Sequence, residues 1–220
     1  MYDAAFYDTI RPGCQSSAAV IVPLLATHFA PASVIDVGCG EGWFCKAWAD
    51  TGVDDVVGID GDYVADHRAP GDWTFFPFDL SSITADVCLH GFAGQADLVM
   101  SLEVAEHLPA DMADGFVAAL CASAPIVVLS AAIPGQGGTG HVNEQWPDYW
   151  AEKLDSEGFV VSGALRWQLW SDDRVENWYR QNLLVAVDRC HAAADLDLLT
   201  SDSPPAAVVH PVLYDARRTR

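Results

Sequence analysis

The stretch Val34-Ile35-Asp36-Val37-Gly38-Cys39-Gly40-Glu41-Gly42 is an apolar run with one acidic residue, followed by glycine at every second position. β-Branched residues before the glycines are typical of a buried parallel strand, and glycine permits a tight turn and close approach of the backbone to a ligand. The spacing G-x-G-x-G differs from the G-x-G-x-x-G that holds a dinucleotide pyrophosphate. The stretch predicts a loop for a different nucleotide-type cofactor, and a plain strand-to-helix turn is the open alternative.

Strand-like runs alternate with helical segments along the chain. Helix-compatible spacing over 16–29 ends before Pro31. The expected strands are 33–37, 56–60, 73–76, 98–102, 126–130, 159–170 and 178–187. This alternation predicts an α/β fold with a doubly wound, mostly parallel sheet, and the short connection 171–177 predicts a C-terminal antiparallel hairpin.

Length and composition predict one domain. A chain of 220 residues with 51% hydrophobic residues can bury a single substantial core. We expect this domain over 1–190, with about the first 30 residues as a helical lid, and a peripheral extension over 191–220, rich in Ala, Asp, Ser and Pro. Apolar runs such as 18–25 and 126–133 are too short to span a bilayer, so no membrane partner is expected.

Charge and cysteine usage limit the partners and the compartment. The formal net charge is −20, from 11 Lys plus Arg and 31 Asp plus Glu, and this acidity would repel phosphates. Nucleic acid is therefore not expected as a partner. Six cysteines without a C-x-x-C pair, and an N-terminus without a secretory signal pattern, predict a reducing cytoplasmic location.

The glycine loop and the segments after it resemble motif I of the class I S-adenosylmethionine (SAM) dependent methyltransferases. The resemblance covers roughly residues 30–190 and implies a seven-stranded Rossmann-like sheet with a terminal antiparallel hairpin. It implies SAM as the cofactor, with the glycine loop around its methionine part. The cofactor-binding residues expected on this basis are Asp36, Gly38, Cys39, Gly40, Gly42, Asp60, Gly61, Asp79, Leu80 and Ser101.

Two carboxylates follow expected strands at the edge where ligands bind in open α/β sheets. Asp60 is positioned to accept hydrogen bonds from both ribose hydroxyls of a bound adenosine, and a cap for the following segment is the alternative. Asp79 is placed to accept from the adenine amino group, and an N-cap of the next helix explains it equally well. For Asp36, the family resemblance implies a role in orienting the loop and the SAM amino group.

The segment Ser101-Leu102-Glu103-Val104-Ala105-Glu106-His107 carries an E-x-x-E-H pattern. On a helix, this spacing places all three polar side chains on one face. With His141, the set resembles the metal site of methyltransferases that act on small-RNA 3′ ends and of some ubiquinone-pathway O-methyltransferases. The resemblance implies a divalent ion (Mg, Mn, Fe or Zn) at Glu103, Glu106, His107 and His141.

A metal-free reading stays open, because glutamate in a first helical turn is also favoured by the helix dipole. In that reading His107 or His141 is the general base, and a plain loop histidine is the alternative for His141. Aromatic residues are expected to wall the acceptor side, with a glycine-rich lid over 132–146 and Tyr2, Phe6 and Tyr7 closing from the other side. The aromatic residues are Trp146, Trp150, Trp167, Trp170, Trp178 and Tyr179.

Together these patterns predict a SAM-dependent methyltransferase that methylates a hydroxyl of a small molecule, such as a sugar or a secondary metabolite. The alternatives are N-methylation of an amine and a non-catalytic SAM-binding regulatory protein. A small-molecule acceptor is the expected partner, and a homodimer is an open possibility. The acceptor itself is not specified by the sequence, because acceptor specificity lies in loop shapes.

Overall fold

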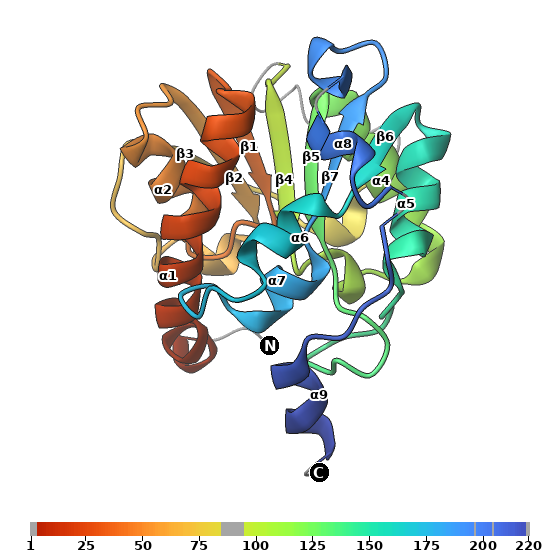
Figure 1. Cartoon of the computed structure of the whole chain (residues 1–220). Helices are drawn as coiled ribbons and strands as arrows, with labels where there is room; N and C mark the ends of the chain where they lie inside the picture. Colours follow the sequence, from red (N-terminus) through yellow and green to blue (C-terminus); the bar gives the residue numbers. More distant parts are fainter. Residues whose placement is uncertain (1–3, 85–94, 196, 204, 219–220) are drawn as a thin grey trace.

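The computed structural model describes residues 4–84, 95–195, 197–203 and 205–218, so Cys88 lies outside the described residues. A seven-stranded sheet of order β3-β2-β1-β4-β5-β7-β6 forms its centre (Figure 1). The strands are β1 Ser33–Val37, β2 Asp55–Asp60, β3 Thr74–Pro77, β4 Leu98–Leu102, β5 Ile126–Ser130, β6 Phe159–Ser162 and β7 Leu184–Asp188. The first five are parallel, and β7 is antiparallel to β5 and β6, which confirms the predicted class I methyltransferase fold.

Helices cover both faces of the sheet, because its strands are apolar on both faces. On one face, α1 (Ala4–Phe29), α2 (Trp43–Asp50) and α6 (Ala164–Leu169) pack on side chains such as Val34 and Met100. On the other, α4 (Ala113–Ser123) and α5 (Pro147–Ser156) pack on side chains such as Ile35 and Val99. Two apolar layers therefore fix the sheet, and its carboxyl edge is left for loops. The short 3-10 turns are Asp62–Val64, Leu80–Ser82, Ala105–His107, Ala110–Met112 and Ala192–Asp195.

Three expected elements differ from the structure. The N-terminal helix begins at Ala4 and continues through Pro12 and Pro23. The run 159–170 is a strand only to Ser162, and 178–187 only from Leu184 onward, so the predicted hairpin loop at 171–177 is wrong. Helices α6 and α7 (Asn177–Asn182) fill the connection between the two strands. The aromatic residues of this connection favour a strand locally. Leu165 and Leu169 of α6, four residues apart, are both buried on one side, and their burial stabilises a helix instead.

The C-terminal segment is tied to the domain by a fully buried arginine. Arg166 has 0% exposure, and its guanidinium donates to Asp202 Oδ2 at 2.5 Å and to the Ala206 carbonyl at 2.9 Å. The backbone N–H of buried His210 donates to Gln181 Oε1 at 2.7 Å. Residues 202–203 and 205–210 therefore form a strap over α6 and α7. The strap lies between α8 (Asp197–Thr200) and α9 (Pro211–Arg218), and α9 projects beyond the body of the molecule (Figure 1).

No helix in the described part of the chain combines the length and the apolar character that crossing a bilayer requires.

The strap predicts a stability difference between two acidic positions. Asp202→Asn should lower the free energy of unfolding by about 2 kcal/mol, because the buried Arg166 charge loses its counter-charge while one hydrogen bond stays possible. Asp172→Asn, whose partner Arg174 is 71% exposed, should change it by less than about 1 kcal/mol. Urea denaturation of the variants measures both values. Equal effects of the two substitutions would contradict a stabilising role for the strap.

Candidate functional site

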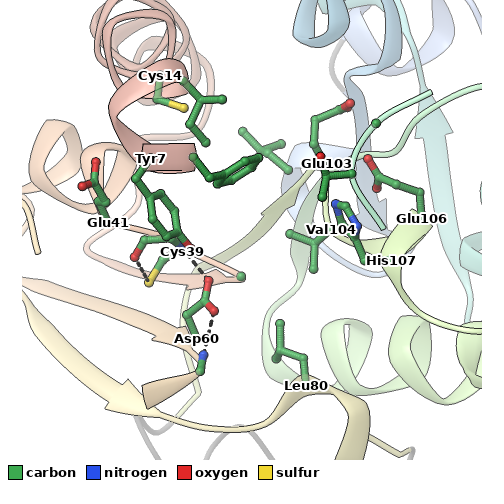
Figure 2. A pocket seen from close by; sticks show the side chains of 18 of the residues that line it. Tyr7, Cys14, Cys39, Glu41, Asp60, Leu80, Glu103, Val104, Glu106 and His107 are labelled. Carbon is green, nitrogen blue, oxygen red and sulfur yellow. Dashed lines mark hydrogen bonds between the residues drawn. The ribbon is translucent and has the colours of Figure 1, made fainter. Parts of the chain in front are cut away.

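A cavity of about 830 Å³ opens at the carboxyl edge of β1, β2 and β4. Its walls come from the N-terminal half of α1, the glycine loop, residues 60–63 and 77–81, and the segment after β4. Residues 136–139 of the glycine-rich segment close another side. Figure 2 shows Asp60 and Cys39 on one side of this space and Glu103, Glu106 and His107 on the other. Ligands of open α/β sheets bind at such an edge.

The glycine loop has a conformation that side chains rarely adopt. Gly38, Gly40 and Gly42 have φ of 80°, 52° and 81°, in the left-handed region that glycine enters without steric cost. Gly38, Cys39 and Gly40 line the cavity as predicted. Gly42 does not: it precedes α2, and a Cβ there would lie 2.3 Å from the Trp73 ring. The structure therefore places Gly42 outside the cavity wall, where it shapes the turn into the helix, and its cofactor contact stays a prediction.

Asp60 joins the two loops that flank the cavity. Its carboxylate is 5% exposed and accepts hydrogen bonds from the Gly40 N–H at 2.7 Å, the Gly61 N–H at 2.6 Å and the Tyr63 hydroxyl at 2.6 Å (Figure 2). Asp60 and Gly61 both line the cavity. The carboxylate therefore fixes the glycine loop against the end of β2 and still faces the cavity.

Of the predicted cofactor-binding residues Asp79 and Ser101, the first lines the cavity and the second does not. The Asp79 carboxylate caps the turn Leu80–Ser82, accepting from Ser81 N–H at 3.0 Å and Ser81 Oγ at 2.7 Å, and these bonds lower its pKa. Asp79 and Leu80 also line the cavity, so the cap and the cofactor contact are compatible. Ser101 is fully buried, and its hydroxyl donates to the Val37 carbonyl at 2.8 Å. Ser101 does not line the cavity, because the strand directs this side chain into the sheet, and its cofactor contact stays a prediction.

Asp36 is an acid in an apolar environment at the cavity wall. It is 3% exposed, and the Cys45 thiol donates to its Oδ2 at 3.6 Å. Burial raises the pKa of Asp36 to about 7, and the nearby charge of Asp60 raises it further. The carboxyl group thus changes charge state near neutral pH.

The pair Arg11–Glu41 was not identified from the sequence. Arg11 donates to Glu41 through Nε at 2.8 Å and Nη2 at 2.5 Å, and Trp43 Nε1 adds a third bond at 2.9 Å. Although desolvation opposes it, the Arg11 hydrogen bond leaves the pKa of Glu41 lowered. The partners lie 30 residues apart, so no local pattern indicates the contact. It holds α1 over the glycine loop.

The N-terminal part of α1 supplies a wall of the cavity, as predicted for two of three aromatic residues. Phe6 and Tyr7 line the cavity, whereas Tyr2 lies outside the described residues. Gly137, Gly138 and Thr139 of the predicted lid also line it.

The E-x-x-E-H residues do not share a helical face. Glu103 has φ of 56°, and Ala105–His107 form a 3-10 turn, so the chain changes direction between the two glutamates. Glu103 Oε1 accepts from Asn182 Nδ2 at 3.0 Å and Oε2 from Gln136 Nε2 at 2.8 Å. The predicted place of Glu103 on a common face is wrong, because a left-handed backbone and two amides direct it elsewhere.

Glu106, His107 and His141 do converge. One ligand atom from each lies within 4.8 Å of the others, and the imidazole rings of His107 and His141 meet edge-to-face with centroids 4.8 Å apart. Glu106 is 0% exposed, and neither of its carboxylate oxygens accepts a hydrogen bond from the described residues. His141 Nε2 lies 3.9 Å from Glu106 Oε1, and its Nδ1 lies 2.9 Å from Glu144 Oε1.

Burial governs the charge states in this cluster. It raises the pKa of Glu106 well above the usual carboxyl value, and the Glu103 charge adds to the effect. Burial and then the neighbouring His141 lower the pKa of His107. His107 is consequently a neutral imidazole at neutral pH and able to accept a proton.

The predicted aromatic wall is only partly present. Trp178 and Tyr179 line the cavity. Trp150, on the buried face of α5, is 2% exposed and packs in the core. Trp146 and Trp167 are 38% and 46% exposed and do not line the cavity. Trp170 packs against the His210 ring of the strap, with centroids 4.6 Å apart.

The sheet order, the glycine loop and the strand-end carboxylates around one cavity define a class I SAM-dependent methyltransferase. Residues 13–177 match the family described as "Methyltransferase domain", and the chain belongs to that family. The chain therefore carries a methyltransferase domain.

One curated relative and several solved structures show what the chain is similar to. The tRNA U34 carboxymethyltransferase of Alcanivorax borkumensis is 33% identical over 113 residues, which cover 46% of this chain and 33% of that protein. The chain thus spans about a third of that relative's length.

Among solved structures, the magnesium protoporphyrin IX methyltransferase of Synechocystis PCC 6803 with bound SAH has a TM-score of 0.57 and 23% identity. That match covers 82% of this chain and 86% of the other. An O-methyltransferase family protein of Burkholderia thailandensis has a TM-score of 0.59 and 15% identity, over 85% of this chain and 60% of the other. At these identities the likeness establishes the fold.

The raised pKa of Asp36 predicts a pH dependence of stability. Between pH 4 and the folded value of about 7, the folded state binds the proton more tightly than the unfolded state, so stability falls as pH rises. Relative to Asp36→Asn, the wild-type free energy of unfolding should decrease over this range by up to about 4 kcal/mol. Urea titrations from pH 4.5 to 7.5 measure the difference, with Asp54→Asn as an exposed control. Parallel wild-type and Asp36→Asn profiles would contradict the shift.

Proposed function

We propose that this enzyme transfers the methyl group of SAM to a hydroxyl of a small molecule, such as a sugar or a secondary metabolite. The observation that carries the proposal is that one cavity joins the glycine loop and Asp60 to the cluster of Glu106, His107 and His141. The first group suits an adenosine cofactor, and the second supplies a base.

The residues on the cofactor side fit SAM. The Asp60 carboxylate retains acceptor capacity for the ribose hydroxyls, because each oxygen carries two lone pairs. Asp79 and Leu80 are placed for the adenine, and Gly38 to Gly40 for the methionine part. Asp36 is the candidate partner of the SAM ammonium group, and the ionised form that this partner favours is accessible near pH 7.

Proton removal is assigned to the histidine pair. When bound, SAM supplies an electrophilic sulfonium methyl. Neutral His107 accepts the hydroxyl proton as the acceptor oxygen attacks, and His141, hydrogen-bonded to Glu144 through Nδ1, is the second candidate base. Alignment of the acceptor in the cavity provides most of the rate enhancement.

The cluster also fits a divalent ion. Two imidazoles and a carboxylate are a common donor set for Mn, Fe and Zn, and an ion would satisfy the orphaned buried oxygens of Glu106. A bound ion would lower the pKa of an acceptor hydroxyl. Glu103 is not part of this donor set, since both of its oxygens are held by amides.

N-Methylation of an amine is the second candidate. The Glu106 carboxylate supports N-methylation, because it accepts no hydrogen bond from the described residues and can bind the ammonium form of an amine.

SAM binding tests the cofactor assignment. Asp60→Ala should weaken SAM binding at least tenfold in calorimetry, because two charge-assisted hydrogen bonds of about 1.5 to 3 kcal/mol each are lost. Asp55→Ala changes an exposed acid at the other end of the same strand and should leave the affinity within about twofold. Unaltered affinity in Asp60→Ala would remove the ribose assignment, and no binding to the wild type would remove SAM.

Metal binding requires a separate measurement. Titration of the apoprotein with Mn²⁺ in a calorimeter should show one site, lost in Glu106→Gln because a carboxylate ligand is removed. Glu103→Gln should keep the affinity within about threefold, because its carboxylate bonds to amides instead. A loss of Mn²⁺ binding in Glu103→Gln would show that the amides release this carboxylate. Unchanged binding in Glu106→Gln would exclude the site.

A further inference from the structure

The acceptor end of the cavity contains carboxylates without cationic partners. Glu106 is fully buried, neither of its oxygens accepts a hydrogen bond from the described residues, and the nearest imidazole nitrogen, His141 Nε2, lies 3.9 Å away. Glu103 is held by the neutral amides of Gln136 and Asn182. Among the described residues that line the cavity, Arg11 is the one Arg or Lys, and Glu41 and Asp8 already engage its guanidinium. An anion in this space would meet repulsion from these carboxylates, and the described cavity wall offers it no free Arg or Lys.

Most other cations in the described part of the chain also have partners outside the cavity. Seven of the 11 Lys and Arg residues form ion pairs with carboxylates. Arg68 lies over the Phe75 ring at 5.3 Å. The remaining three lie in Arg217-Arg218-Thr219-Arg220, and Arg217 donates to the Gly137 carbonyl of the glycine-rich segment. The internal stretch 85–94 contains neither Lys nor Arg in its sequence.

We infer that the acceptor carries no phosphate or carboxylate group: the site takes a neutral or amine-bearing hydroxyl compound, and Glu103 determines this specificity. The inference rests on the proposed function, since it names the class of acceptor for the same cavity. Glu103 lines the cavity, and two amides fix the direction of its carboxylate. Its remaining lone pairs can accept from a hydroxyl or ammonium group of the acceptor, whereas an anion is repelled.

A divalent ion at Glu106 would not reverse this selection. It would neutralise charge within the set of Glu106, His107 and His141, but it would not contact Glu103, whose oxygens are held by Gln136 and Asn182. Burial raises the pKa of Glu103, and the hydrogen bonds from these two amides favour its ionised form. The positions of the Gln136 and Asn182 amides are in turn fixed by Gln181. Gln181 donates to both the Gln136 and the Asn182 side-chain oxygens and accepts from the strap at His210.

The charge of the methylated product tests the inference directly. The full-length enzyme is incubated with methyl-labelled SAM and a small-molecule extract of the producing cells, and the labelled product is applied to anion and cation exchangers at pH 7.5. We expect the label to pass through the anion exchanger. Retention there, with release by salt, would overturn the inference. If no labelled product forms, the proposed function is in question, and a second measurement decides the inference.

The second measurement probes the cavity without an acceptor. Thr139→Cys places a thiol on the cavity wall, and its reaction rates with cationic and anionic methanethiosulfonates are compared at low salt, with wild-type rates subtracted. The cationic reagent should react at least tenfold faster. Adding Glu103→Gln should reduce this ratio severalfold, whereas adding Glu152→Gln, an equal charge change at an exposed site of α5, should not. Equal rates, or a ratio insensitive to Glu103→Gln, would contradict the inference.

Once an acceptor is known, kinetics with that acceptor distinguish a role of Glu103 in acceptor binding from a structural role. Glu103→Gln should raise the KM for the acceptor about tenfold while SAM affinity stays within about twofold. Equal losses in both would indicate a structural role.

Discussion

The hydrogen bond from the Gly40 N–H to the Asp60 carboxylate is the interaction on which the arrangement of the site depends. It connects two loops that follow neighbouring parallel strands, and the Gly61 N–H bonds to the same carboxylate. The glycine loop can make this contact because its glycines occupy left-handed backbone conformations. The carboxyl edge of the sheet is thereby held open as a cavity.

The opposite side of the cavity is built on buried acids. The Glu103 carboxylate is stabilised by two side-chain amides, whereas the Glu106 carboxylate accepts no hydrogen bond from the described residues. Burial of an unpartnered carboxylate is unfavourable, and it persists in folded proteins mainly at functional sites. The contrast between the two glutamates separates their proposed roles: Glu106 joins the histidines, and Glu103 faces the acceptor.

The relatives differ widely in what they modify, as their names indicate: a tRNA, a magnesium porphyrin and an unspecified O-methyl acceptor. A shared fold does not determine the acceptor, because one fold can carry sites for different substrates. In this chain the family match ends at residue 177, before Asn182 and the strap that supports Gln181. The part of the molecule that orients Glu103 is therefore partly outside the shared domain.

By itself, the sequence determined the sheet, the glycine loop and the strand-end acids. Apolar runs, glycine spacing and carboxylates after strands are local signals, and Asp36, Gly38, Gly40 and Asp60 lie at the cavity as expected. The tertiary structure decided which of the remaining candidates meet. The Ser101 side chain points into the sheet, and Gly42 packs in the turn before α2. Glu103 points away from Glu106, because its backbone is in a left-handed conformation that its local sequence does not indicate. Contacts such as Arg11–Glu41 and Glu103–Asn182 join residues far apart in the chain, so packing of whole elements fixes them rather than any pattern of neighbouring residues.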